Sequence, residues 1–341
     1  MKGMVTVMKN HIIWFIILFS MACFSKEKAA GEVVESSSSS KLTEEENELY
    51  KDRMKDFIRE IRKNATGNKI IITQNGNELY FRNGELDRNF FHVTDGTTQE
   101  SLYYGDVLKY NAVTEKESTE YMLSLLNSIR KAGKSVFPIN YAKGTEKRNF
   151  LIREDRKTGF ISELLPEFEA RAIYSPIRGF NSENITRLDQ AKNFLLLLNP
   201  EKFKNTDQYF EYMKNTDFDL LIIEPSHSGV FFTKEQTEAL KTKKNGGKRL
   251  VIAYFSIGEA EDYRVYWKKE WNKKWPGWIV EENPDWKGNY VVKYWEKEWK
   301  DIVKEYQKKL DNIGVDGYLL DTVDSYYYFH EKMEKGKKIL D

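Results

Sequence analysis

The sequence predicts an α/β fold, a (β/α)8 or TIM barrel, on three observations. From residue 43 onward, short apolar runs alternate with helical patterns, and eight of these runs have the length of strands. The runs are continuously apolar, as in parallel strands covered on both faces. Residues 43–341 also exceed the roughly 250 residues that such a barrel needs. The alternative is a doubly wound open sheet, but no G-x-G-x-x-G or Walker sequence follows any strand, which weakens its nucleotide-binding form.

The first half of the predicted domain opens with a helix whose start is marked by a capping box of Thr43 and Glu46. A later helix has the same pattern at Thr114 and Glu117, and Gly133 ends it. Helices are expected in this half at residues 43–61, 114–133, 147–158 and 183–192. Strands are expected at residues 69–73, 89–94, 135–140 and 171–175.

The second half continues the alternation. Thr233 and Gln236 cap one helix, and Gly314 ends a long amphipathic one. Strands are expected at residues 194–198, 218–223, 249–255 and 315–320, and helices at residues 203–214, 233–247 and 295–310. Residues 257–294 form a long, Trp-rich insertion. We therefore expect residues 43–341 to be a single barrel domain.

Composition excludes several classes of function. The chain has 54 Lys and Arg against 53 Asp and Glu, a net charge of +1, whereas a nucleic-acid-binding protein would show a basic excess. One Cys and four scattered His give neither a disulfide framework nor zinc-ligand spacing. We therefore expect no metal, no organic cofactor and no nucleic-acid partner.

The N-terminal segment has the pattern of a targeting sequence. Lys2 and Lys9 precede an apolar run at residues 12–21, which has the length of a signal-peptide core but is short for a membrane span. The only cysteine, Cys23, follows this run, as in bacterial lipoprotein signals, although Ser20 stands where those signals usually have Leu. Met8 is an alternative start. A plain secretory signal or an N-terminal anchor helix remains the alternative interpretation.

The predicted organisation is a signal peptide at residues 1–22, then a lipidated Cys23 and a flexible tether to residue 42. An unbroken serine run from Ser36 to Ser40 makes the tether unable to bury a core. We expect the protein in a bacterial cell envelope, lipid-anchored through Cys23, or secreted. The anchor makes the membrane a partner, and we expect the barrel to be a monomer.

Carboxylates recur where the predicted strands end, at the rim where barrel enzymes place their active sites. Asp321 directly ends the apolar strand GYLLD, where burying a carboxylate is costly without a purpose or partner. The other polar residues near strand ends are Gln74, Asn75, Glu100, Glu224, Glu259, Glu261, Asp262 and Asp324. Two facing carboxylates are what glycosidic bond cleavage needs, one as acid and one as nucleophile or base. Any single one of these acids has the alternative of a helix cap or a surface ion pair.

Tryptophan is concentrated in one region. After residue 22 the chain has seven, all between Trp267 and Trp299. Trp295 and Trp299 have helical spacing, as expected of core residues. The others, including Trp278, lie in the insertion beside the acids, where an aromatic ring can stack on a sugar. A lid that packs its aromatic residues onto the barrel mouth is the equal alternative.

Residues 218–329 resemble the endo-α-1,4-polygalactosaminidase-like glycoside hydrolases, family 114. The resemblance is carried by the segments FDLLIIE, RLVIAYFSIGEAEDYR, ENPDWKGNYVVKYW and DGYLLDTVDSYYYF. It implies a (β/α)8 barrel that acts on polymers rich in α-1,4-linked galactosamine. The N-terminal segments IIITQNG, DGTTQESLYYG and AGKSVFPINYA resemble the region that lies after the last of those motifs in relatives. This implies a circular permutation, with strand order 5-6-7-8-1-2-3-4 and the strands at 69 and 315 side by side.

The resemblance also implies site residues. Glu261, Asp262 and Arg264 match the family's E-D-x-R stretch, and Asp321 and Asp324 match its D-x-x-D motif. Two departures matter. Leu319 stands where the polygalactosaminidases have a Glu two residues before that motif, which removes an expected catalytic carboxylate. Asn140 and Glu224 stand where the family has Asp.

We therefore predict a secreted, lipid-anchored glycoside hydrolase that acts on a polysaccharide. Asp321 is one predicted catalytic carboxylate, and its partner is expected among Glu259, Glu261 and Asp262. The predicted substrate-binding residues are Tyr254, Arg264, Glu224, Asp324, Glu100, Gln74, Asn75 and Trp278. A non-catalytic glycan-binding surface lipoprotein on the same barrel is the alternative. A structural envelope protein with a plugged barrel is a third possibility.

Overall fold

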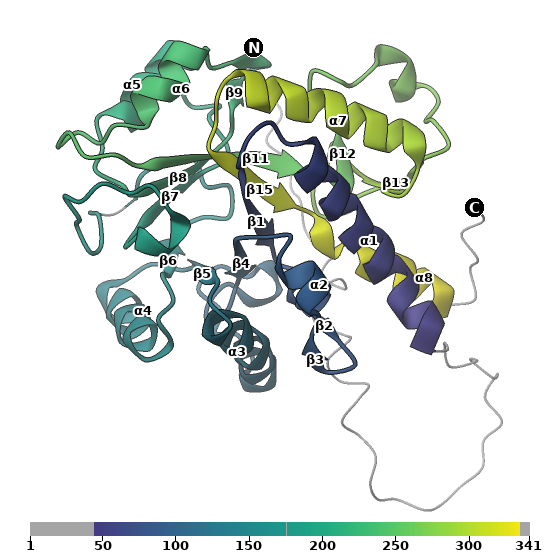
Figure 1. Ribbon diagram of the computed structural model, residues 1–341, viewed down its shortest axis with the longest axis horizontal. Helices are drawn as coiled ribbons and strands as arrows, with labels where there is room; N and C mark the ends of the chain where they lie inside the picture. The colour runs from purple at the N-terminus through teal and green to yellow at the C-terminus, as the bar shows by residue number, and fades with distance from the viewer. Residues whose placement is uncertain (1–43, 175, 335–341) are drawn as a thin grey trace, which may run out of the picture.

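A computed structural model describes residues 44–174 and 176–334 of the chain (Figure 1). The predicted signal peptide, the lipidated Cys23 and the serine-rich tether lie outside these residues. Within the described part, no helix is both long enough and apolar enough to cross a bilayer.

Eight strands form one sheet, and every pair of neighbours in it is parallel. The strands are β1 (Ile70–Gln74), β4 (Gly96–Glu100), β5 (Ser135–Tyr141), β6 (Glu163–Leu165), β7 (Phe194–Leu197), β8 (Leu220–Ile223), β11 (Leu250–Ser256) and β15 (Gly317–Asp321). Their hydrogen-bonded order is β6-β5-β4-β1-β15-β11-β8-β7, and between β6 and β7 the described residues form no ladder. The sheet is thus a nearly closed barrel, and the predicted (β/α)8 fold is confirmed.

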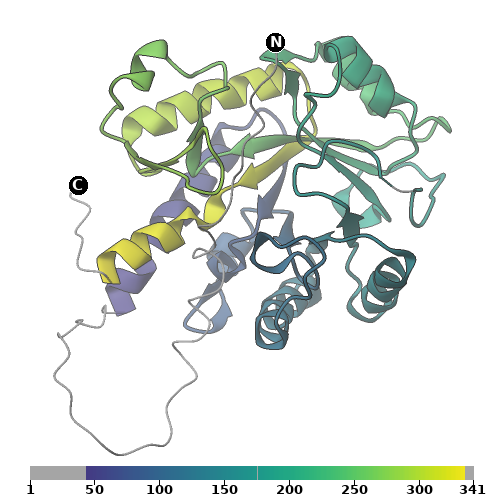
Figure 2. The ribbon, with the colours of Figure 1, turned by 180° about the vertical axis from the view of Figure 1, so that it is seen from behind.

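Helices surround the sheet on its outer side (Figures 1 and 2). The longer ones are α1 (Glu44–Asn64), α3 (Lys116–Lys131), α4 (Thr145–Thr158), α5 (Thr206–Lys214), α6 (Lys234–Leu240), α7 (Lys297–Asn312) and α8 (Tyr326–Glu334). Thr233 caps α6 through the predicted box with Gln236. Helix α7 buries Trp299, Val303 and Leu310, the stripe that the sequence spacing predicts.

Apolar side chains fill two layers. One lies between the strands and the helices, and the other lies inside the barrel, where Ile72, Phe137, Ile252 and Leu319 are buried. Leu319 and Asp321 share one face of β15 because side chains of a strand alternate. The place of the family Glu is therefore a fully buried leucine in the layer below Asp321.

Several secondary-structure predictions are wrong. The helix expected to run to residue 247 ends at Leu240. Thr114 does not cap α3, because Glu115 is its N-cap and the Thr114 hydroxyl donates to the carbonyl oxygen of Ser101.

Residues 89–94 lie in and after the short helix α2 (Arg88–Phe91), which Asp87 caps by accepting from the backbone N–H of Asn89 and Phe90. The strand of this region is β4, which follows the predicted range. Sequence periodicity misses it because its buried residues include threonines, whose hydroxyls form hydrogen bonds with other side chains. Residues 171–174 form no strand, and β6 precedes them. Residues 183–192 contain only a 3-10 turn, at Leu188–Gln190.

The insertion after β11 forms a small antiparallel sheet of β12 (Glu259–Glu261), β14 (Asn289–Val292) and β13 (Ile279–Glu282). The Trp278 ring is buried between those of Trp271 and Trp299, with ring centroids 5.2 and 5.1 Å away. These aromatic contacts fasten the sheet to α7, so the insertion is a fixed part of the barrel rim.

Strands β1 and β15 lie side by side, with Ile70 opposite Gly317. The approach is close: a Cβ on Gly317 would lie 2.1 Å from the carbonyl oxygen of Ile70, so only glycine fits. The predicted permutation requires this pairing. An unpermuted barrel also pairs its first and last strands, so the permutation itself stays a prediction.

Candidate active site

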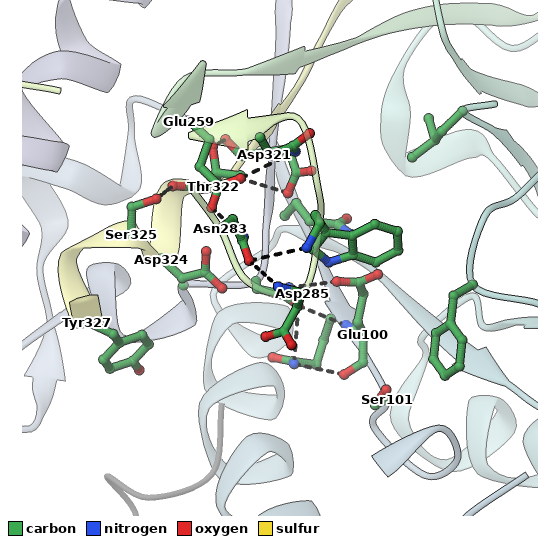
Figure 3. A pocket seen from close by; sticks show the side chains of 18 of the residues that line it. Glu100, Ser101, Glu259, Asn283, Asp285, Asp321, Thr322, Asp324, Ser325 and Tyr327 are labelled. Carbon is green, nitrogen blue, oxygen red and sulfur yellow. Dashed lines mark hydrogen bonds between the residues drawn. The ribbon is translucent and has the colours of Figure 1, made fainter. Parts of the chain in front are cut away.

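A cavity of about 2140 Å³ opens at the carboxyl ends of the parallel strands. Nine predicted site residues line it: Gln74, Asn75, Glu100, Glu224, Tyr254, Glu259, Arg264, Asp321 and Asp324. This is the rim where barrel enzymes build their sites, and the volume exceeds that of a typical small-molecule pocket. Glu100, Glu259, Asp321 and Asp324 come from four different elements and lie around the same space (Figure 3).

Asp321 is the last residue of β15 and is half-buried. The Tyr254 hydroxyl of β11 donates to its Oδ2 at 2.7 Å, and the backbone N–H of Thr322 donates to its Oδ1 at 2.7 Å. Burial, followed by the charge of Glu100, raises the pKa of Asp321 to about 7. The carboxylate is thus held in one orientation and gains its proton close to neutral pH.

Asp324 lies one short turn further, in the 3-10 segment Val323–Ser325. This turn begins at Thr322, whose φ of 60° is left-handed. Within the described residues the Asp324 side chain accepts no hydrogen bond from another residue, although it lines the cavity. Burial and the charges of Asp321, Glu100 and Glu259 raise the pKa of Asp324 well above its usual range. Asp324 therefore holds its proton to a higher pH than an ordinary aspartate does.

Glu259 lies on β12, and its two carboxylate oxygens are both occupied. The side-chain amide of Asn283 donates to Oε1 at 2.8 Å, and that of Asn289 donates to Oε2 at 3.3 Å. Burial raises the pKa of Glu259 to about 7, while the Asn283 hydrogen bond opposes that rise.

Arg264 lines the cavity and joins two acids, Glu224 in the lining and Glu261 behind it. Its Nε donates to Glu261 Oε2 at 2.5 Å, and its Nη1 donates to both oxygens of Glu224, at 2.8 and 2.7 Å. All three side chains are buried. Burial raises the pKa of Glu224, and Arg264 opposes that rise. This arrangement is typical of an ion-pair network that shapes a site.

Three more predicted residues, Gln74, Asn75 and Glu100, belong to a polar cluster beside Asp321. Asn75 donates through its side-chain amide to Glu100 Oε2 at 2.9 Å, and the Tyr141 hydroxyl donates to Glu100 Oε1. The Gln74 side-chain oxygen accepts a hydrogen bond from the Thr98 hydroxyl. The cluster fixes Glu100 at the end of β4, where its charge reaches Asp321 and Asp324.

Three predicted site residues do not line the cavity. Glu261 is buried behind it, against Arg264 and the hydroxyls of Tyr254 and Tyr263. Asp262 is exposed, directly after the end of β12, and does not line the cavity. Trp278 is buried in the insertion core. Glu259 and Glu261 share one face of β12 because side chains alternate along a strand, and Asp262 follows the strand's last residue.

Other lining residues carry no clear signal in the sequence. Asn283 and Asn289 bind Glu259 across the small sheet, and Trp286 lies in the loop between them. Tyr141 is the last residue of β5, where a tyrosine reads as one more core residue of the strand. The only available signal is that residues 283–289 form part of the ENPDWKGNYVVKYW segment.

The cavity is strongly acidic. Fifteen Asp and Glu residues line it, against three Lys and Arg. Negative charges that line a cavity partly shielded from water attract cations and repel anions. The described residues contain no group of three or more His, Cys, Asp or Glu arranged to hold a metal ion.

Comparison with known proteins gives a family match over part of the chain. Residues 199–339 match the model of glycoside-hydrolase family GH114, so the resemblance expected from the sequence is confirmed over this region. It begins just after β7 and includes Glu224, Glu259, Asp321 and Asp324.

Curated relatives match over similar lengths. The uncharacterized protein MJ1477 of Methanocaldococcus jannaschii is 42% identical over 151 residues, 44% of this chain and 43% of that protein. An uncharacterized protein of Thermotoga maritima is 36% identical over 38% of this chain and 42% of its own length. The chain thus spans less than half of either relative. A solved structure, that of Aspergillus fumigatus Ega3 in complex with galactosamine, matches 46% of this chain and 49% of its own chain. The sequence identity is 20% and the TM-score is 0.29. This likeness is too slight to transfer any feature of Ega3 to this chain.

Proposed function

From a barrel whose residues 199–339 match glycoside-hydrolase family GH114, we propose that this protein hydrolyses glycosidic bonds with Asp321 and Asp324 as its carboxylate pair. The observation that carries the proposal is that both acids face one open cavity at the barrel rim, with different hydrogen bonding. Glycosidic cleavage needs one carboxylate ionised and one protonated. When the surroundings of two acids favour the ionised form of one and the protonated form of the other, they determine which acid takes which role.

Asp321 is the base or nucleophile of this pair. Tyr254 and the Thr322 backbone both donate to it, and donors stabilise the ionised form. Asp324 is the general acid, because burial next to other carboxylates, without a donor from another residue, favours its protonated form. It gives its proton to the leaving oxygen, while Asp321 attacks the anomeric carbon or deprotonates the attacking water.

Glu259, Glu261 and Asp262 are less suited to pair with Asp321. Glu261 is committed to Arg264, Asp262 lies outside the cavity, and both oxygens of Glu259 accept amide hydrogen bonds. The pair proposed here therefore replaces the partner expected from the sequence with Asp324.

The substrate we propose is a polysaccharide with cationic amino-sugar units, in particular an α-1,4-linked galactosamine polymer. The acidic lining supports a cationic ligand, since ammonium groups are drawn to it. The size of the cavity suits several sugar units of a chain. The GH114 match over residues 199–339 agrees with a carbohydrate substrate.

Hydrolysis is tested by incubating the purified protein with a panel of amino-sugar polymers and measuring new reducing ends. We expect the galactosamine polymer to be cleaved. Asp321→Asn is expected to reduce the rate about 10²–10⁴-fold, the contribution typical of a catalytic acid or base. Asp262→Asn is the matched control and should behave as wild type, because Asp262 does not line the cavity. Equal rates for wild type and Asp321→Asn would contradict the proposal.

A non-catalytic glycan-binding protein is the second candidate, and Leu319 is the observation that favours it. This residue is fully buried where the resembling enzymes have a carboxylate. The same assay separates the two functions: a binder retains the polymer without releasing reducing ends, in wild type and Asp321→Asn alike.

We further propose that Cys23 carries a lipid that anchors the barrel to a cell-envelope membrane. The proposal is supported by the position of the only cysteine behind the apolar run at residues 12–21. Cys23→Ala is expected to move the protein from the membrane fraction to the soluble fraction, because the lipid is lost. Unchanged membrane retention on fractionation would contradict the lipid anchor.

A further inference from the structure

Trp286 differs from the other tryptophans of the insertion. Trp271 and Trp278 are buried, whereas Trp267 and Trp275 pack against the Tyr290 ring. Trp286 is 44% exposed, lines the cavity and has no aromatic ring contact within the described residues. A large apolar ring that faces a polar cavity without a partner is a candidate binding surface.

The loop that carries Trp286 is held at both ends by one carboxylate. Residues 283 and 289 flank the loop between β13 and β14, and the side-chain amides of Asn283 and Asn289 donate to the two oxygens of Glu259. A carboxylate suits this role because both of its oxygens accept hydrogen bonds. A glutamine there would place an amide group opposite one of the two donors.

Asn283 also shapes the loop itself. Its side-chain oxygen accepts from the backbone N–H of Asp285 at 2.9 Å and of Trp286 at 3.4 Å. At the other end, the backbone N–H of Gly288 donates to Glu282 Oε1 at 3.0 Å. The Asn283 side chain therefore connects the Glu259 carboxylate to the turn that orients Trp286. Figure 3 shows Asn283 next to Glu259.

We propose that Trp286 is a stacking platform for a pyranose ring of the substrate, and that Glu259 is the positioning residue that holds this platform at the barrel rim. The inference rests on the proposed function for the identity of the ligand. A sugar presents an apolar C–H face that an indole ring covers, and the polar groups around the cavity bind its hydroxyls. A loop fixed before binding loses little conformational entropy when the sugar arrives.

The platform is tested by binding rather than by hydrolysis. In the Asp321→Asn background, affinity electrophoresis with an α-1,4-linked galactosamine polymer should show about tenfold weaker binding for Trp286→Ala, with Trp286→Phe in between. Trp275→Ala is the matched control, since Trp275 is 42% exposed in the same insertion but lies outside the cavity lining. Unchanged binding in Trp286→Ala, or no polymer binding in its parent, overturns the platform.

The role of Glu259 is tested separately. Glu259→Gln and Asn283→Ala are expected to weaken polymer binding as Trp286→Ala does and to raise KM, while kcat falls far less than in Asp321→Asn. A loss of kcat in Glu259→Gln with polymer binding intact overturns the positioning role and makes Glu259 a catalytic acid. If wild type binds the polymer through Trp286 without cleaving it, the hydrolase proposal fails and the platform stands.

Discussion

Arg264→Met is expected to lower the free energy of unfolding by about 3–5 kcal/mol, because it leaves two buried carboxylates without their shared cation. Glu224 and Glu261 both bind this guanidinium and are themselves buried. Chemical denaturation at pH 7 measures the loss. Polymer hydrolysis should fall as well, since the same network supports Tyr254, the donor to Asp321.

The pH dependence distinguishes lost charge pairing from lost packing. Burial already raises the pKa of Glu224, and removing Arg264 raises it further. The variant should therefore recover part of its stability as the pH falls and Glu224 takes up a proton. Arg171→Met is the control, because Arg171 pairs with Glu167 at the exposed surface and should matter little. A destabilisation that does not change with pH would contradict the ion-pair explanation.

The pH profile of hydrolysis is the second large expected effect. For the free enzyme, kcat/KM should rise through about pH 7, because Asp321 must be ionised and its pKa is raised to about 7. The rate should fall again at the higher pH where Asp324, whose pKa is also raised well above its usual range, loses the proton it donates. A general acid at Asp324 thus predicts a bell-shaped profile.

Asp324→Asn tests this assignment with two substrates. Polymer hydrolysis should fall about 10²–10⁴-fold and its alkaline limb should disappear. Hydrolysis of a nitrophenyl glycoside should fall much less, because nitrophenolate leaves without a proton. Asp321→Asn is the comparison, and it should lose both activities. Equal losses on the two substrates in Asp324→Asn would show that Asp324 is not the general acid.

The fold was predictable where burial and apolar sequence coincide. Strands β1, β5, β11 and β15 are runs of apolar residues, and the sequence locates them within a residue or two. Strand β4 has the sequence GTTQE, and its threonines are buried by hydrogen bonding to Gln74 and to other threonines. Such burial depends on neighbours that come together only after folding, so periodicity cannot reveal it.

The candidate site was predictable where an acid ends a strand. Asp321 and Tyr254 lie in the cavity because strand direction alone puts them at the rim. The sequence could not separate Glu259 from Glu261, which lie on one face of β12; the turn that brings Arg264 to Glu261 decides between them. The role of Asn283 could not be predicted from the sequence, because its hydrogen bond to Glu259 depends on the pairing of β12 and β14.

Among the residues that the structure describes, β6 and β7 form no ladder, and this opening lies across the barrel from β1 and β15. Strand β15, which ends at Asp321, is hydrogen-bonded to β1 on one side and to β11 on the other. We therefore expect local opening of the barrel wall to be easier between β6 and β7 than at β15. A substrate chain that widened this opening would leave both ladders of β15 in place, and with them the position of Asp321.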